Sequence, residues 1–227
     1  MPQSIDKKNK LVLYFLILIL LSTIGNKDII KNENPFLQIN KINVSGLSND
    51  ENENVAKSLK SFLNENILFV NKSEVYEILS KNNLIELFSV KKKYPSFINV
   101  DLKKTDFIAI TFQNDINFLV GSNGKLIKYK KIDKRLPFIF GKIDFKNFLN
   151  FKNLIDKSNF KFEEIDSLYF FPSNRWDIKT KDGIEIKLPV KDLLKALTIA
   201  HNVMNNEQFN INKIIDLRIL DNIIISE

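Results

Sequence analysis

The chain has 227 residues and no cysteine, with 34 lysines and arginines against 27 aspartates and glutamates, a formal net charge of +7. The hydrophobic fraction of 44% is enough for one large or two small cores without disulfides. A nucleic-acid site is not indicated, because such sites favour arginine and the only arginines are Arg135, Arg175 and Arg218. With no cysteine and a single histidine, the composition also argues against zinc.

An uncharged segment runs from Leu11 to Asn26 and follows Lys7, Lys8 and Lys10. Lysines before the segment predict a cytoplasmic tail (1–10), with the chain after the segment on the far side of a membrane. As a helix, residues 11–26 would be about 24 Å long, short of the roughly 30 Å hydrocarbon core. The favoured interpretation is a short anchor, with membrane residues Leu11, Leu16 and Leu21. A cleaved signal peptide is the alternative, although no clear cleavage site follows.

A polar linker is expected over residues 27–37, and a small β-α-α-β-β domain over residues 38–107. Ile39, Ile42 and Val44 predict the first strand. Ser48 and Glu51 form a capping-box pattern before an amphipathic helix at 49–65. Asn71 or Ser73 caps a second helix, whose buried face is predicted to be Val75, Ile78 and Leu79. Two strands then follow, at 87–90 and 97–102, on either side of a turn at Tyr94-Pro95.

Residues 108–227 contain many short strands and predict a mainly antiparallel β domain with two helices, so the fold class is α+β. A two-residue Asn123-Gly124 turn would place Phe118 and Val120 opposite Tyr129 and Ile127.

A second hairpin is expected on either side of Asp182-Gly183. A three-residue loop, 181–183, keeps the apolar residues on one face, with Ile178 opposite Ile186 and Trp176 opposite Leu188. The same register places two pairs of opposite charges on the solvent face: Lys179 with Glu185, and Asp177 with Lys187. Trp176 is therefore predicted to be core.

The two helices of this domain are predicted from apolar stripes. One stripe is Phe148, Phe151 and Ile155; the other is Leu193, Leu194, Leu197, His201 and Met204. His201 is interpreted as a core or boundary residue, because no nucleophile or base accompanies it. Residues 121–125 (Gly-Ser-Asn-Gly-Lys) superficially resemble a phosphate loop, but a strand follows where a phosphate loop needs a helix. Lys91, Lys92 and Lys93 are interpreted as a solvated strand end, with a lipid- or partner-facing patch as the alternative.

The chain ends on an apolar strand, Ile223 to Ile225, after a strand at 214–220 and a turn at Asp221-Asn222. An edge strand is normally protected by charge, proline or a bulge, and here only Glu227 serves. Either this strand lies inside the sheet or another chain covers it.

The order of these features resembles the bacterial cell-division family FtsQ/DivIB. The resemblance rests on the basic N-terminus, the apolar segment, the POTRA-type domain and the β domain. The matching segments are 39–46, 66–70, 90–95, 98–102, Ala109, Leu136-Pro137, Gly141, 176–188 and 215–218 (Ile-Asp-Leu-Arg). Departures are Lys104, where a glutamate is common, Gly121 in place of an aspartate, and Leu188-Pro189 in place of Leu-Gly.

The resemblance implies a non-enzymatic scaffold at the division site of the inner membrane, without cofactors. Its C-terminal edge would accept a strand from small coiled-coil partners of the FtsB and FtsL type, and its POTRA domain would contact other division proteins. Arg175 matches the arginine that pairs with a partner acid in the family. The predicted partner-binding residues are Arg175, Leu217, Arg218, Ile219, Leu220, Ile223, Ile224 and Ile225. Arg175 could instead stack on Trp176, and Arg218 could reach a carboxylate of its own domain.

Two other classes of function stay open at this point. A generic POTRA-type assembly or chaperone factor for exported proteins has the same domain pattern. A secreted enzyme with a cleaved signal peptide is disfavoured because no catalytic set of residues is visible.

Overall fold

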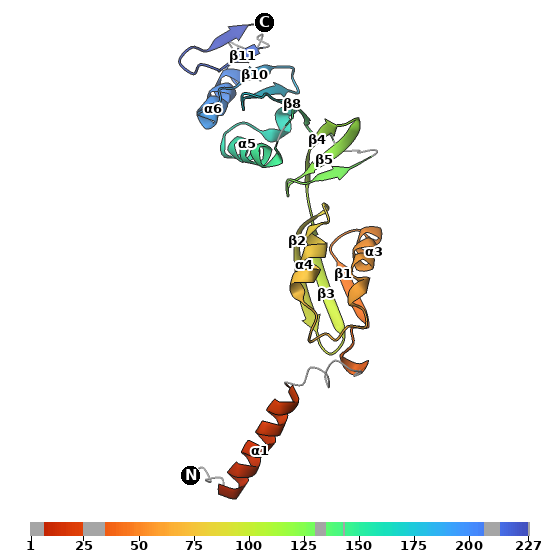
Figure 1. Cartoon of the computed structure of the whole chain (residues 1–227). Helices are drawn as coiled ribbons and strands as arrows, with labels where there is room; N and C mark the ends of the chain where they lie inside the picture. The colour runs from red at the N-terminus through yellow and green to blue at the C-terminus, as the bar shows by residue number, and fades with distance from the viewer. Residues whose placement is uncertain (1–6, 25–34, 130–134, 143, 207–213, 227) are drawn as a thin grey trace. The chain divides into compact units, whose positions relative to one another are not determined.

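The computed structural model describes residues 7–24, 35–129, 135–142, 144–206 and 214–226 (Figure 1). The chain divides into two compact units. The first contains residues 1–79 and 88–102, and the second contains residues 80–87 and 103–227.

The apolar N-terminal segment forms helix α1, Lys7–Ile24 (Figure 1). The predicted membrane residues Leu11, Leu16 and Leu21 are 72%, 57% and 63% exposed on this helix. Over the part of the chain that the structure describes, no helix has the length and apolar content to cross a membrane. Most of the predicted linker lies outside the described residues, and its end forms a short 3-10 helix, η1, at Pro35–Leu37.

The POTRA-type domain has the predicted β-α-α-β-β order. Its elements are β1 (Lys41–Ser45), α3 (Asn49–Ser58), the 3-10 helix η2 (Lys60–Phe62), α4 (Lys72–Ser80), β2 (Ile85–Lys93) and β3 (Phe97–Lys104). Strand β3 lies between β1 and β2 and is parallel to β1, with Val44 opposite Val100. The prediction of one helix over 49–65 is wrong in length, because the α-helix ends at Ser58 and a separate 3-10 turn follows.

Two predicted caps are present in this domain. Ser48 and Glu51 form the capping box of α3, where the Ser48 N–H donates to the Glu51 carboxylate at 3.0 Å. Asn71, rather than Ser73, caps α4, because its side-chain oxygen accepts the Ser73 N–H at 3.0 Å. Val75 and Leu79 of α4 are 1% exposed, whereas Ile78 is only partly buried.

The second unit is built on a nine-stranded sheet with the order β12-β11-β10-β9-β8-β7-β4-β5-β6. The strands are β4 (Phe107–Gln113), β5 (Ile116–Gly121), β6 (Leu126–Lys128), β7 (Phe138–Phe140), β8 (Ile165–Phe170), β9 (Trp176–Thr180), β10 (Glu185–Lys187), β11 (Ile214–Asp216) and β12 (Ile224–Ser226). Most neighbouring strands are antiparallel, as predicted. The pairs β4–β7, β7–β8 and β10–β11 are parallel.

Helices α5 (Phe145–Lys157) and α6 (Leu193–Met204) pack on the sheet through one hydrophobic core. The predicted stripe of α5 is confirmed, because Phe148, Phe151 and Ile155 are at most 2% exposed. The stripe predicted for α6 is wrong in part, because its buried residues are Ala196, Leu197 and Ala200. Leu194 is 42% exposed, and Leu193, His201 and Met204 are only partly buried.

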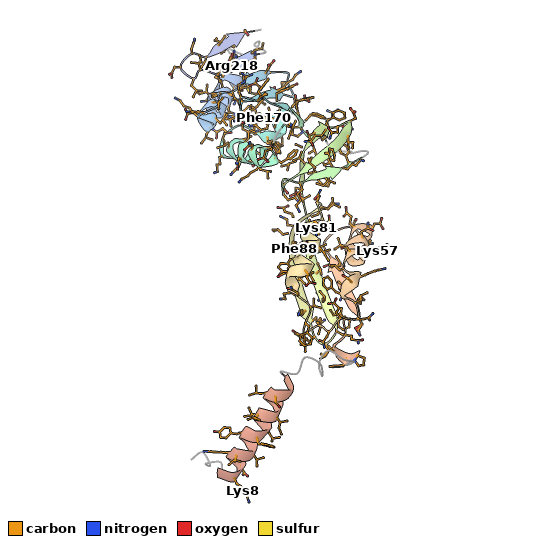
Figure 2. The ribbon with its side chains drawn as sticks, in the orientation of Figure 1. Lys8, Lys57, Lys81, Phe88, Phe170 and Arg218 are labelled. Atoms are coloured by element: carbon orange, nitrogen blue, oxygen red, sulfur yellow. The ribbon has the colours of Figure 1, made fainter. Side chains whose placement is uncertain are left out.

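Trp176 lies in this core and is 3% exposed. Its ring stacks on Phe151 with centroids 4.8 Å apart and an interplanar angle of 5°, and Phe170 contacts it at 4.7 Å. Figure 2 shows Phe170 within this part of the chain. The interpretation of Trp176 as core is confirmed.

The register of the β9–β10 hairpin is as predicted. Ile178 lies opposite Ile186, and Thr180 N–H donates to the Ile184 carbonyl at 2.9 Å, which closes a three-residue loop. Gly183 has φ +87°, the left-handed conformation that such a loop requires. One consequence drawn from that register is wrong: Asp177 lies on the face away from the core, as predicted, but its side chain is covered there and is only 3% exposed.

The register predicted for the β5–β6 hairpin is wrong by one residue. Val120 lies opposite Leu126 and Leu119 opposite Ile127, so the loop is Ser122-Asn123-Gly124. Gly124 alone takes the left-handed conformation there, with φ +74°. The Asn123 side chain accepts the Lys125 N–H at 3.0 Å and donates to the carbonyls of Asn83 and Ile85, which holds the longer loop in place.

Candidate protein-interaction site

Strand β12 is the terminal strand of the nine-stranded sheet. It pairs only with β11 among the described strands, with Ile215 opposite Ile225 and Asp216 opposite Ile224. Main-chain groups along a strand point alternately to its two sides, so an edge strand presents unpaired N–H and C=O groups to the outside. Of the two positions that the sequence leaves open for this strand, the structure shows the edge.

Apolar side chains surround this edge. Ile219 is 66% exposed, Ile224 is 55% exposed and Ile223 is 40% exposed, while Ile225 and Leu220 are partly buried. Leu217 differs from the other predicted partner-binding residues, because it is 0% exposed and belongs to the hydrophobic core. The Leu217 side chain therefore points into the core, because the strand alternation that turns Ile215 inward turns Leu217 inward too.

A row of polar side chains leads to the edge across four strands. The row consists of four successive register partners: Tyr169 of β8, Asp177 of β9, Lys187 of β10 and Asp216 of β11. Asp216 in turn lies opposite Ile224 of β12. Residues next to them along the strands (Trp176, Ile178, Ile186, Ile215) belong to the core under α5 and α6. The row therefore lies on the opposite face of the sheet, which we call the outer face.

Arg175 is held on the outer face by two contacts with its own domain. Its Nε and Nη2 donate to the two oxygens of Asp177 at 3.2 and 3.3 Å, and its guanidinium lies 4.3 Å from the ring centre of Phe171. The stacking partner is therefore Phe171 rather than Trp176. Because a guanidinium has five N–H donors, three are left after the bidentate pair with Asp177.

The Asp177 carboxyl is buried beneath this guanidinium. Burial raises its pKa above the ordinary value, and the charge and hydrogen bonds of Arg175 oppose that rise without cancelling it. The carboxylate thus fixes the direction of Arg175 at a cost in desolvation.

Arg218 is held in a similar way by Asp216. Its Nε and Nη2 donate to the Asp216 carboxylate at 2.9 and 2.6 Å, and the Arg218 N–H donates to the same group at 3.1 Å. The predicted reach of Arg218 to a carboxylate of its own domain is confirmed. The guanidinium remains about half exposed beside the edge (Figure 2). These hydrogen bonds lower the pKa of the Asp216 carboxyl.

The lowered pKa of Asp216 predicts a pH-dependent contribution to stability. A carboxyl whose pKa is lower in the folded state binds more protons when unfolded, so its contribution is present above its ordinary value of 3.8 and is lost as pH falls through the folded value. We expect Asp216→Asn to lose less stability than the parent between pH about 7 and about 3. Fluorescence-monitored denaturant unfolding at both pH values measures this difference. Arg218→Gln should reduce the pH dependence of the unfolding free energy in the same way. An equal pH dependence in all three proteins would contradict a contribution from the Asp216–Arg218 pair.

Three other residue groups singled out in the sequence have ordinary structural surroundings. His201 lies on α6 with its Nε2 3.0 Å from the Asn205 amide nitrogen. Residues 121–125 form the hairpin turn described above, followed by strand β6. Lys91 pairs with Asp101 at 3.3 Å at the end of β2.

Sequence reasoning missed the connection between Arg175, Asp177, Lys187, Asp216 and Arg218. The sequence does show charged residues at alternate positions in three strands. It does not show the order of those strands, because β10 pairs in parallel with β11 and α6 lies between the two in the chain.

The fold and the site define a two-domain protein in which a POTRA domain precedes a β domain with an open strand edge. Residues 37–104 match the family model "POTRA domain, FtsQ-type", and residues 110–218 match the model "Cell division protein FtsQ/DivIB, C-terminal". The chain belongs to the FtsQ/DivIB family of bacterial cell-division proteins.

Three curated relatives that match the chain are cell-division proteins. The cell division protein FtsQ of Rickettsia bellii is 28% identical over 185 residues, which cover 80% of this chain and 69% of that protein. The FtsQ of Rhizobium meliloti is 21% identical over 81% of this chain and 60% of that protein, and the DivIB of Clostridium botulinum is 27% identical over 46% and 41%. A solved structure of the major extracytoplasmic domain of DivIB from Geobacillus stearothermophilus covers 48% of this chain and 98% of that structure, at 14% identity and a TM-score of 0.35.

Proposed function

We propose that this protein is a non-enzymatic scaffold of the division machinery that receives a strand from another division protein along β12. The observation that carries the proposal is an edge strand with exposed isoleucines and no protecting charge among its described residues. Family membership supports a role in division. The proposed partners are small coiled-coil proteins of the FtsB and FtsL type.

The pattern of side chains at the edge indicates what such a strand needs. Residues of an added strand would alternate between the outer face beside Ile224 and the core face beside Ile225. Because Ile225 is partly buried next to core residue Ile215, an apolar partner residue would extend the core there. On the outer face, Arg218 lies near enough to the edge to favour an acidic partner residue.

Arg175 cannot be reached by that strand alone. It stands immediately before β9, and three strand spacings of about 4.8 Å separate β9 from β12. A contact between Arg175 and a partner acid therefore requires a second segment of the partner that lies across the outer face. The fixed guanidinium, with three N–H groups unused by Asp177, is suited to such a contact.

The N-terminal segment is proposed to hold the protein at the cytoplasmic membrane, with the two domains on the outer side. Helix α1 alone is short for a bilayer, so the proposal needs lysine side chains that extend to the headgroups and a locally thinner bilayer. Flotation of the full chain with lipid vesicles after alkaline washing tests this attachment. Recovery of the intact chain in the soluble fraction would contradict it.

Localisation tests the division role. A fluorescent fusion to the full chain is expected to collect at the division plane of growing cells. A uniform distribution around the envelope would contradict the scaffold proposal and favour a general POTRA-type assembly factor instead. Cross-linking from a photoreactive residue at Ile223 in the same cells identifies the neighbouring chain directly.

A further inference from the structure

Three segments of the POTRA-type domain meet at one end and expose apolar side chains there. The segments are 35–40, 66–72 and 92–96. The Ile67 N–H donates to the Leu37 carbonyl at 2.9 Å, and the Asn40 N–H donates to the Ser96 carbonyl at 3.0 Å. Lys92 Nζ joins the other two segments by donating to the Leu68 carbonyl at 3.3 Å. Figure 1 shows η1 and the β2–β3 turn at the same end of the domain.

Large apolar residues at this end point outward instead of into the core. Phe36 is 67% exposed, Tyr94 is 59% exposed, Phe69 is 50% exposed and Leu68 is 45% exposed. Their neighbours Ile67 and Val70 are 0% and 5% exposed, so the segment has a well-packed inner side and an apolar outer side. We call the four exposed residues, together with Lys72, Lys92 and Lys93, the tip surface.

The charge around these side chains is positive. The three segments hold Lys72, Lys92 and Lys93 and no acidic residue, while Glu65 and Glu74 flank the second segment. Lys72 and Lys93 are exposed. Burial, followed by the positive charge of Lys72, lowers the pKa of Lys92. Exposed rings among lysines match the interface of a bilayer, where aromatic side chains lie at the headgroup level and lysines meet anionic lipids.

The chain also limits how far the tip surface can be from α1. Eleven peptide steps join Ile24 to Pro35, a reach of at most about 40 Å. If α1 is attached to a membrane, the tip surface stays within that reach of the same lipid. The tether keeps the tip surface near lipid whether or not a partner protein is present, which favours lipid as the occupant.

We infer that the tip surface binds the headgroup region of a bilayer containing anionic lipids, with Phe69 and its exposed neighbours inserted and the lysines against lipid phosphates. This contact is separate from the strand addition at β12. It rests in part on the membrane attachment proposed for α1.

The chain has no cysteine, so a single introduced cysteine reports one position in the full-length protein. Phe69→Cys carries an environment-sensitive dye, and Asn54→Cys, exposed on α3, is the matched control position. Both proteins are reconstituted into phosphatidylcholine vesicles with and without phosphatidylglycerol. The dye at position 69 is expected to shift to shorter wavelength in the anionic vesicles and to be quenched by brominated lipid, and the dye at position 54 is not.

Charge variants test the role of the lysines. Lys72→Gln with Lys93→Gln is expected to reduce the binding constant of the tip surface for anionic lipid about 25-fold, since each lysine near an anionic surface counts for about fivefold. Lys57→Gln with Lys60→Gln removes the same charge from another part of the domain and should leave the dye signal unchanged. Circular dichroism checks that each variant is folded.

The outcomes separate the two proposals about the membrane. If the chain floats with the vesicles but the dye at position 69 reports water in both lipid mixtures, the tip inference is overturned and the α1 attachment stands. If the chain does not float, both are overturned. A dye shift that is equal in neutral and anionic vesicles, or equal for the two pairs of lysine variants, overturns the role of charge complementarity.

Discussion

Replacing Phe151 by alanine is expected to lower the free energy of unfolding of the β domain by about 3–5 kcal/mol. The Phe151 side chain is 2% exposed and its ring stacks on Trp176 at 4.8 Å, so the truncation leaves a cavity between α5 and the sheet. The ring centre of Phe148 lies 6.4 Å from that of Trp176, and Phe148 is 0% exposed. This close packing leaves the neighbouring side chains little freedom to fill the cavity.

The single tryptophan makes this measurement specific to one domain. Trp176 lies in the β domain, so its fluorescence during denaturant unfolding of the full chain reports that domain and not the POTRA domain. The control is Asn150→Ala on the exposed side of the same helix, which should change the stability by less than about 0.5 kcal/mol. A Phe151→Ala loss of under about 1 kcal/mol would mean that α5 is not fixed on the sheet as described.

The same core shows why one hairpin register could be predicted and the other could not. In β9 and β10 the apolar residues alternate with charges, so a shift by one residue would bury Lys179 and expose Ile178. In β5 the sequence Phe118-Leu119-Val120 is apolar at every position, and a one-residue shift carries no such penalty. The register of that hairpin instead depends on the Asn123 side chain, which donates hydrogen bonds to the carbonyls of Asn83 and Ile85, some 40 residues earlier in the chain.

In the candidate site, too, some features follow from the local sequence and others depend on the pairing of distant strands. Local pattern was enough to predict a terminal strand with little protection, although the strand is Ile224–Ser226 and Ile223 lies just before it. Its position at the edge depends on β11 pairing with β10, which no local pattern specifies. The burial of Asp177 was missed because alternation assigns a residue to a face of the sheet but does not say which neighbouring side chain covers it. Leu217 was listed among the partner-binding residues, but its side chain lies in the core, because it alternates inward with Ile215.

A substitution on the edge strand β12 is expected to have a large effect on partner binding. Ile224→Lys is expected to weaken the binding of an FtsB- or FtsL-type partner by at least about tenfold, equivalent to about 1.4 kcal/mol. Ile224 is 55% exposed, so the change removes little buried surface from the folded domain. A lysine at this place brings a strongly hydrated charge beside Arg218 and against the incoming strand, which is the usual way in which natural edge strands prevent pairing.

A matched change away from the edge separates loss of binding from loss of fold. Phe112→Lys makes a similarly exposed apolar residue cationic on β4, at 51% exposure, and five strands lie between β4 and β12 in the sheet order. Pull-down with the partner should be unaffected by that variant and should fail, or need much more partner, with Ile224→Lys. Trp176 fluorescence must report a folded β domain in both proteins. Equal binding by the two variants would mean that β12 is not where the partner pairs, and the exposed isoleucines would then need another explanation.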